Sequence, residues 1–398
     1  MKTHREALFI INTLKSKGYE VYFAGGWPRD YLLGVDSDDI DIATNAKPED
    51  IKKLFKKTIP VGITFGIIIV VIDNKQFEVA SFRKESDYLD GRHPSFIEYT
   101  DAKSDAQRRD FTINGMFYDP TNEKIIDYIN GKEDLEKKII KAIGSPINRF
   151  TEDKLRMIRA IRFAVRFDFE IEKETKKAIK KLSNTLFPAV SIERVYQELI
   201  KMTYHDFKKA LCMLYEFHLL QVIFPSLDKF PINSIEKVNN FPKNTSPISK
   251  IMLLFEDSSL EEKIGVCKYL KTSNEDIAFI ILLEKVKDLI LKKNSNLVDW
   301  AYLLAEDKID ICIQITSLYF PESKRSHFFK EIEEKRQNLQ KAIFRIKSND
   351  PVVKAKDLIN IGIKPGKEMG ILLKKAEMLA INENIEDPQT IISKLIKP

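Results

Sequence analysis

Three carboxylates in the first hundred residues have types and spacing suited to chemistry. Asp39 and Asp41 alternate with isoleucines in the stretch DDIDIAT, and Glu78 lies within the apolar stretch QFEVASF. Alternate side chains of a β-strand share a face, so the two aspartates would lie close together and repel each other. A glutamate in an apolar strand is also costly unless it is paired or metal-bound. We therefore expect all three to be catalytic, with Asp39 and Asp41 binding Mg²⁺, which prefers carboxylate oxygens.

Two adjacent glycines precede the aspartates and favour a functional interpretation of them. An isolated Asp-X-Asp more often lies on a solvent-exposed strand edge. Here Gly25 and Gly26 come directly before a predicted short helix with Pro28 at its first position. Glycine lets backbone N–H groups approach a ligand, and a helix N-terminus favours phosphate. Arg29, in the first turn, can bind phosphate oxygens, so a phosphate site beside a metal site predicts two-metal nucleotidyl transfer.

The elements that must position these residues change character along the chain. Up to about residue 130, short strands and helices alternate, with a hairpin that turns at Asp73-Asn74-Lys75 and a polar loop over 83–107 that holds one short strand. From about Pro146 the periodicity is helical, and 151–167 reads as one helix. This pattern predicts an α/β head with a mixed sheet, followed by an extended all-α neck, body and tail. We place the head at 1–145, the neck at 146–205, the body at 206–325 and the tail at 326–398.

Composition narrows the class of protein. Of the 398 residues, 43% are hydrophobic, yet no apolar run approaches the ~20 residues of a membrane span. The N-terminal stretch reads as an amphipathic helix and lacks a signal-peptide design. The three cysteines lie far apart, which argues against a zinc site or disulfides and favours the reduced cytoplasm. We expect a cytoplasmic protein with no membrane association, and no obligate protein partner is evident.

Positive charge is concentrated after the first 150 residues. Residues 1–150 carry 23 Lys and Arg against 24 Asp and Glu, whereas the remainder carries 42 against 35. Any single cluster of basic residues in this region could equally be part of a solvent-exposed helix face. Spread over a long helical region, such groups could also follow the phosphate backbone of a nucleic acid.

Five motifs, in order over residues 20–200, resemble one family. They read GGWPRDYLLGVDSDDIDIAT, RRDFTINGM, DYINGKEDL, EDKLRMIRAIRF and SIERVYQEL. The chain resembles class II tRNA nucleotidyltransferases and bacterial poly(A) polymerases, and the segment 362–377 resembles their C-terminal part more loosely. Two positions depart from the pattern: Pro28 replaces the usual Val, and Gly115 the usual Ala. Proline at the first helical position removes only an N–H that has no partner there, so we expect the phosphate site to survive.

The resemblance implies a polymerase-β-like head, metal ligation at Asp39 and Asp41, and phosphate contacts at Gly26 and Arg29. It implies base recognition in the neck and tRNA binding in the tail. It also assigns nucleotide contacts to one further group of residues: Arg109, Asp153, Arg156, Arg159 and Arg162. Asp110 and Asn114 match positions associated with ribose recognition, which would favour ribonucleotides.

Asp153 and Arg156 suggest how bases could be chosen without a template. Three residues apart on a helix, they would be neighbours on its surface. An Asp acceptor beside an Arg donor complements the edges of cytosine and adenine, which offer an amino group next to a ring nitrogen, and rejects guanine and uracil. An ordinary salt-bridged helix face would give the same pattern. The former interpretation matches CCA addition to tRNA 3′ ends from CTP and ATP, as in the family.

Several alternatives stay open. The loop DYLDGRHPSFIEY resembles the flexible loop of full CCA-adding members, which favours CCA addition over CC addition. A-adding enzymes and poly(A) polymerases share all five motifs. A non-catalytic RNA-binding protein with a degenerate head is a more remote possibility, because the chain retains all three carboxylates.

Overall fold

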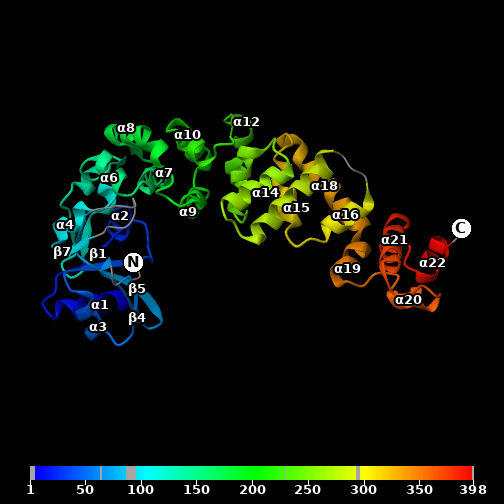
Figure 1. Cartoon of the computed structure of the whole chain (residues 1–398), viewed down its shortest axis with the longest axis horizontal. Helices are drawn as coiled ribbons and strands as arrows, with labels where there is room; N and C mark the ends of the chain where they lie inside the picture. Colours follow the sequence, from blue (N-terminus) through cyan, green and yellow to red (C-terminus); the bar gives the residue numbers. More distant parts are fainter. Residues whose placement is uncertain (1–4, 63–64, 87–95, 228, 293–295, 397–398) are drawn as a thin grey trace. The chain divides into compact units, whose positions relative to one another are not determined.

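The computed structural model describes residues 5–62, 65–86, 96–227, 229–292 and 296–396. The chain divides into two compact units, Met1–Phe230 and Pro231–Pro398, and each is considered by itself. Figure 1 shows the order of the elements along the chain. The finer boundaries between head, neck, body and tail stay predictions.

A mixed sheet forms the first part of unit 1, as the sequence predicts. In the described residues its seven strands run in the order β3-β4-β5-β2-β1-β8-β9, and only the β2–β5 pair is parallel. The strand bounds are β1 Val21–Ala24, β2 Asp41–Thr44, β3 Thr58–Gly62, β4 Ile67–Ile72, β5 Lys75–Ser81, β8 Phe117–Asp119 and β9 Lys124–Ile126. The register pairs Ala24 with Asp41 and Ile42 with Val79, so the glycine turn, the aspartates and β5 are neighbours.

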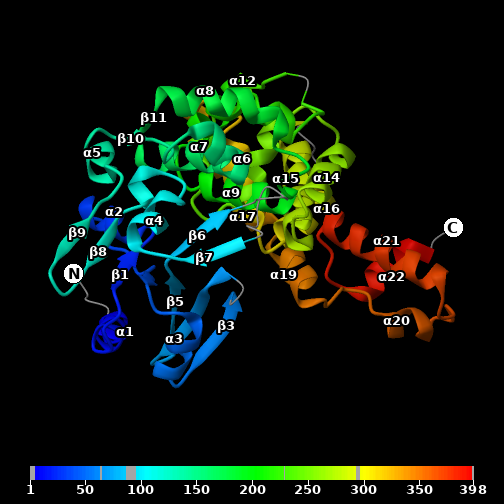
Figure 2. The ribbon, with the colours of Figure 1, turned by 60° about the vertical axis from the view of Figure 1, so that its left-hand side comes forward.

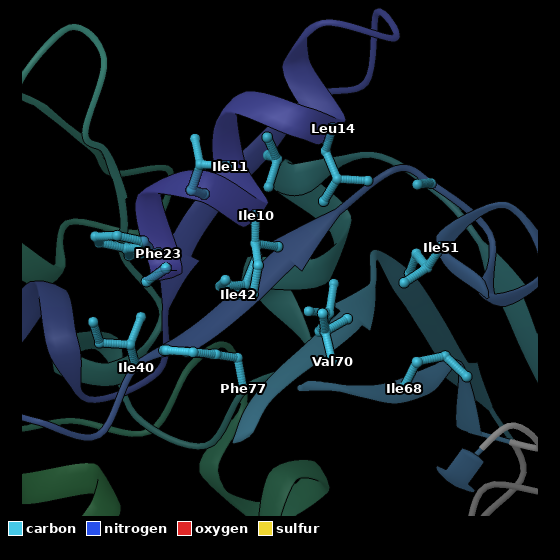
Figure 3. Close-up of a cluster of buried hydrophobic side chains, with 14 of the residues drawn as sticks. Ile10, Ile11, Leu14, Phe23, Ile40, Ile42, Ile51, Ile68, Val70 and Phe77 are labelled. Atoms are coloured by element: carbon cyan, nitrogen blue, oxygen red, sulfur yellow. The ribbon is translucent and has the colours of Figure 1, made fainter. Parts of the chain in front are cut away.

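Helix α1 (Arg5–Lys15) covers one face of this sheet. Figure 3 shows Ile10, Ile11 and Leu14 packed over strand residues that include Ile42 and Val70. All five of these side chains are buried. Ile40 and Ile42 both lie in this core, as their alternation with aspartates predicts, and burial of such side chains contributes about 1.5–3 kcal/mol each.

The hairpin β4–β5 turns where the sequence predicts, because Asp73 and Asn74 both adopt positive φ (48° and 63°). The next segment differs from its prediction. Two paired strands, β6 (Arg83–Ser86) and β7 (Phe96–Tyr99), replace the single one expected, and α4 (Ala102–Gln107) occupies the end of the predicted loop. Residues 87–95 of the loop that resembles the flexible loop of CCA-adding members lie outside the described residues.

The remaining elements of unit 1 are mainly helical. Their bounds are α2 Trp27–Leu32, α3 Pro48–Leu54, α5 Gly131–Glu136, α6 Pro146–Glu152, α7 Leu155–Phe167, α8 Lys173–Leu182, α9 Ile192–Met202, α10 Phe207–Glu216 and α11 Leu219–Ile223, with a 3-10 turn at Thr112–Asn114 and short strands β10 Ile139–Ile140 and β11 Glu170–Ile171. In Figure 2, where colour follows the sequence, helices α6 to α9 come after the strands of the sheet in chain order. Helix α7 packs against α9 and α10.

Unit 2 is helical throughout its described residues. The α-helix bounds are α12 Ile232–Ile235, α13 Pro247–Ile251, α14 Leu260–Tyr269, α15 Asn274–Leu291, α16 Leu297–Leu304, α17 Ile309–Ser317, α18 Glu322–Asn338, α19 Gln340–Ser348, α20 Ala355–Asn360, α21 Lys367–Glu383 and α22 Pro388–Ile396. Leu358, Met369 and Ile391 belong to a core that joins α20 to α22. None of the helices in the described ranges is both long and apolar enough to cross a membrane.

Candidate active site

A cavity of about 640 Å³ in unit 1 gathers most of the residues that the sequence singles out. Of the predicted site residues, only Glu78 lies outside its wall. Seven arginines and one lysine face four aspartates, which suits a polyanionic ligand such as a nucleoside triphosphate. The lining residues are Gly25, Gly26, Arg29, Asp39, Asp41, Arg108, Arg109, Asp110, Asn114, Asp153, Arg156, Arg159, Arg162, Phe163, Arg166, Lys201, Tyr204 and His205.

The two aspartates lie beside the glycine turn. Asp41 begins β2, while Asp39 is exposed just before the strand. A Cβ atom placed on Gly25 would lie 2.3 Å from Asp41 Oδ2, well inside contact distance. The absence of a side chain at residue 25 is therefore what leaves room for the Asp41 carboxylate.

Glu78 lies on β5, which pairs with β2, and it lines a smaller cavity of about 190 Å³ together with Asp41 and Arg109. Burial raises the pKa of Asp41 to about 6, and the charges of Glu78 and Asp39 add to this rise. Arg109 offsets only part of this rise, so a divalent cation would fit beside these carboxylates. Among the described residues, no three His, Cys, Asp or Glu side chains are already gathered into a metal-binding group, so Asp39 and Asp41 stay the predicted ligands.

Gly25→Ala is expected to reduce nucleotide transfer by about 100-fold, because its methyl group would displace Asp41 by an ångström or more. Gly34→Ala is the matched control. Both glycines have positive φ (67° and 68°), so both substitutions strain the backbone equally. A Cβ at Gly34 meets nothing within 4 Å, so only the Gly25 variant should lose activity. Equal activity of the two variants, measured as steady-state incorporation, would refute this role of Gly25.

A chain of hydrogen bonds links the predicted ribose and nucleotide residues. Arg159 on α7 donates to Asp110 Oδ2 through Nε (3.0 Å) and Nη2 (2.6 Å), and Asn114 Nδ2 donates to Asp110 Oδ1 (3.1 Å). Burial alone would raise the pKa of Asp110, but Arg159 and Asn114 outweigh it and hold the pKa below its usual range. Asp110 is therefore ionised and fixed, and so it orients both partners.

Arg29 continues this chain from helix α2. Its Nη1 donates to Asn114 Oδ1, and its Nε and Nη2 donate to Asp30 Oδ1 at 2.9 and 2.7 Å. The guanidinium also lies 4.5 Å from the centre of the Phe167 ring, and the residue is only 3% exposed. Arg29 lines the cavity, but most of its donors hold Asn114 and Asp30 in place.

The expectation that Asp153 and Arg156 are paired on one helix is wrong. Asp153 has an extended backbone (φ −141°, ψ 106°) and interrupts the predicted helix between α6 and α7. Its Oδ1 accepts the backbone N–H of Leu155, and its Oδ2 accepts Arg194 Nη2 at 3.0 Å. The Asp side chain competes with helical backbone hydrogen bonds and starts α7 afresh.

Arg156 has other partners. Its Nη1 donates to Glu152 Oε2 (2.7 Å) and to the carbonyl of Arg149, and its Nη2 donates to the carbonyl of Arg108. Both Asp153 and Arg156 nevertheless line the cavity, so the predicted acceptor and donor both reach it, each held by different hydrogen-bond partners.

Residues of α9 and the turn after it complete the cavity and were not predicted. Glu198 is 3% exposed and accepts Arg162 Nε at 2.5 Å, which anchors the third arginine of α7. Arg194 and Glu198 are four residues apart in the motif SIERVYQEL, and this spacing could have indicated a common face. Lys201 continues that spacing in the last turn of α9, and His205 lies in the turn that follows the helix.

Comparisons with known proteins find relatives over nearly the whole chain. A family model described as the poly A polymerase head domain matches residues 21–141. A second, described as a probable RNA and SrmB-binding site of polymerase A, matches residues 168–230. A CCA-adding enzyme of Ligilactobacillus salivarius is 34% identical over 98% of this chain and 95% of its own length. A CCA-adding enzyme of Enterococcus faecalis is 32% identical over 99% of this chain and 95% of its own length.

Solved structures show the same architecture. The Bacillus stearothermophilus CCA-adding enzyme in complex with CTP has a TM-score of 0.81 and 26% identity, with 100% of this chain and 98% of that chain covered. The Thermotoga maritima CCA-adding enzyme in complex with tRNA shares the fold, with a TM-score of 0.67 and 22% identity over 98% and 94% of the two chains. The expected fold class, an α/β head followed by helices, is confirmed.

Proposed function

Because the chain belongs to the CCA-adding enzyme family, we propose that it adds C and A nucleotides to the 3′ end of tRNA, taking them from CTP and ATP without a nucleic-acid template. The observation that carries this proposal is the cavity of unit 1, which gathers the predicted phosphate, ribose and base residues beside two aspartates. We place this activity in the cytoplasm.

The triphosphate and the ribose of the incoming nucleotide would each contact a different group of residues on the cavity wall. The turn at Gly25 and Gly26 and the guanidinium of Arg109 would receive the triphosphate. Asp110 and Asn114, fixed by Arg159 and Arg29, would accept and donate to the ribose hydroxyls. Asp39 and Asp41 would hold Mg²⁺, which, when bound, supplies charge neutralisation for phosphoryl transfer. Glu78 adds its charge beside Asp41 from β5 and would support the same function.

Base choice would fall to Asp153 and Arg156. Asp153 would accept the amino hydrogen of cytosine or adenine, and Arg156 would donate to the ring nitrogen. Arg194 would position Asp153, and Arg162, held by Glu198, would lie along the same wall. The two bases share one hydrogen-bonding edge, so one site could accept both in turn.

An incorporation assay tests this function directly. Transcripts of tRNA that lack the terminal CCA are incubated with labelled CTP alone, ATP alone or both. We expect two C residues with CTP alone and a complete CCA end with both nucleotides. Long A tracts would indicate a poly(A) polymerase. A CC end that ATP does not extend would indicate a CC-adding enzyme. Addition of A only to transcripts that end in CC would indicate an A-adding enzyme. No incorporation at millimolar Mg²⁺ would contradict the proposal as a whole.

The helical region is proposed to bind the body of tRNA. In unit 2 a cavity of about 650 Å³ is lined by four basic residues, by three acidic ones and by Phe344, which is 71% exposed. The basic residues are Lys341, Arg345, Lys354 and Lys356, and the acidic ones are Asp350, Asp357 and Glu386. Basic groups around an exposed aromatic ring suit contact with RNA through phosphates and stacking. The tail predicted at 326–398 contains all of these residues.

The tRNA affinity should fall steeply as salt rises. Residues 151–230 carry 15 Lys and Arg against 11 Asp and Glu, and residues 231–398 carry 27 against 24, so we expect phosphate contacts in both units. Contacts to about six phosphates would weaken binding by roughly 10³-fold between 50 and 200 mM salt. Fluorescence anisotropy of labelled tRNA measures this dependence. A dissociation constant that stays flat over this range would contradict a basic binding surface.

A further inference from the structure

Four residues on the active-site cavity wall have no part in the proposed binding of the incoming nucleotide. Lys201, Tyr204 and His205 lie at the end of α9 and in the turn that follows, and Arg166 lies in the last turn of α7. The triphosphate, ribose and base are already accounted for by other parts of the wall. Nucleotidyl transfer needs two substrates in one cavity, and the second of them is an RNA end.

These side chains have the chemistry of a nucleotide site. Tyr204 is 65% exposed, which is unusual for a large aromatic side chain. No recorded hydrogen bond or ring contact within the described residues involves it. An exposed, unengaged ring on the wall of a charged cavity offers a stacking surface for a base.

Two cations line the same cavity as this ring. Lys201 is 53% exposed and has a long contact to Glu198 (3.6 Å), and Glu198 is also bound by Arg162. Arg166 is 35% exposed and has a contact of 3.6 Å to Asp30. Neither contact is at optimal ion-pair distance, so both cations can turn towards a phosphate.

His205 completes the group without adding charge. Burial lowers the pKa of His205, and the positive charges of Arg166 and Arg162 lower it further. The imidazole is therefore neutral at physiological pH and can pack against a base or share a hydrogen bond with a ribose. The stretch matched by the family model for RNA binding, 168–230, includes Lys201, Tyr204 and His205.

We infer that Tyr204, Lys201, His205 and Arg166 form a subsite for the 3′-terminal nucleotides of the acceptor RNA, with a base stacked on Tyr204 and a backbone phosphate held by Lys201 and Arg166. This inference rests on the proposed function. It assigns these four residues to the RNA and leaves the rest of the cavity wall to the incoming nucleotide.

Tyr204→Ala tests the inference in the full chain. Loss of one stacked base should raise KM for tRNA lacking CCA by about 5- to 100-fold at saturating CTP. The equilibrium Kd for CTP should stay unchanged, which also verifies that the variant is folded. Tyr204→Phe keeps the ring and should restore the KM for tRNA. Phe9→Ala is the matched control, because Phe9 is an exposed aromatic on α1 (54%) and is not on the cavity wall.

Lys201→Met supplies an independent measure. Removing one contact to a single-stranded phosphate should reduce the slope of log K against log salt by about 0.7, whereas Tyr204→Ala should leave that slope unchanged. An unchanged KM for tRNA in Tyr204→Ala would overturn the inference, and so would a weaker CTP affinity, which would place the ring under the incoming base. If the wild-type chain itself incorporates no nucleotide, the proposed function fails and the inference fails with it.

Discussion

Asp41→Asn should abolish nucleotide transfer without harming the fold. The carboxylate is a predicted Mg²⁺ ligand, and loss of several kcal/mol of charge stabilisation in the transition state lowers the rate by on the order of 10³-fold or more. The neighbouring Ile40 and Ile42 stay in the core, so the strand keeps its packing. Incorporation of labelled CTP at several Mg²⁺ concentrations measures the loss.

The same variant should be at least as stable as the wild type when metal is absent. Burial, Glu78 and Asp39 raise the pKa of Asp41 to about 6, so the ionised form is disfavoured in the folded chain. The wild type is therefore destabilised as pH rises through about 6, whereas the uncharged Asn is not. In EDTA, we expect the Tm of Asp41→Asn to equal or exceed that of the wild type at pH 8, and the difference to shrink below pH 6.

A matched variant distinguishes the loss of a metal ligand from the loss of any one negative charge in this region. Asp36 is exposed and lies outside the cavity, so Asp36→Asn should retain full activity. Activity of Asp41→Asn near that of Asp36→Asn at millimolar Mg²⁺ would remove Asp41 from the catalytic group. A lower Tm in EDTA at pH 8 would show that the carboxylate has a structural role instead.

Asp153→Ala should destroy the discrimination between CTP and UTP. Loss of one hydrogen bond to the cytosine amino group weakens transition-state binding by ~1–3 kcal/mol, or about 10- to 100-fold in kcat/KM for CTP and ATP. The change also removes the acceptor that faces the carbonyl oxygen of uracil. Selectivity therefore falls from both directions, while the Mg²⁺ requirement stays the same.

The capping role of Asp153 calls for a second variant. Asp153 Oδ1 accepts the N–H of Leu155 at the start of α7, and a lost cap costs about 1 kcal/mol. Asp153→Asn keeps an oxygen for that N–H and presents an amide donor to the base, so it should keep the cap and accept UTP better, although it loses the ion pair with Arg194. If both variants prefer CTP over UTP as strongly as the wild type, Asp153 is only a helix cap and a partner for Arg194.

Local patterns were sufficient for much of the head. The β4–β5 hairpin follows from two residues that tolerate positive φ between apolar runs, and Ile40 and Ile42 are buried because alternate residues of a strand face the same core. The glycine turn also lies where the sequence places it. These features depend on neighbours within a few residues, so one sequence suffices to predict them.

Features that depend on distant partners could not be read in this way. Apolar residues keep their helical spacing through 151–167, so this spacing does not reveal the interruption of the helix at Asp153. The interruption depends on the hydrogen bonds of the Asp153 side chain. Asp110 and Arg159 are far apart in sequence, and only the packing of α7 brings them together. The place of Tyr204 on the cavity wall was missed for the same reason, because exposure is a property of the folded chain.

The chain of contacts from Arg159 through Asp110 and Asn114 to Arg29 bears on how this protein can diverge. It ties α7, which follows the predicted head boundary, to helix α2 through four groups, of which Arg29 and Asn114 are buried. A chimera whose incoming neck lacks Arg159, or holds it in another position, would leave Asp110 without its counter-charge. Recombination between relatives should therefore succeed more readily at crossovers that keep residues 29 to 159 from one parent.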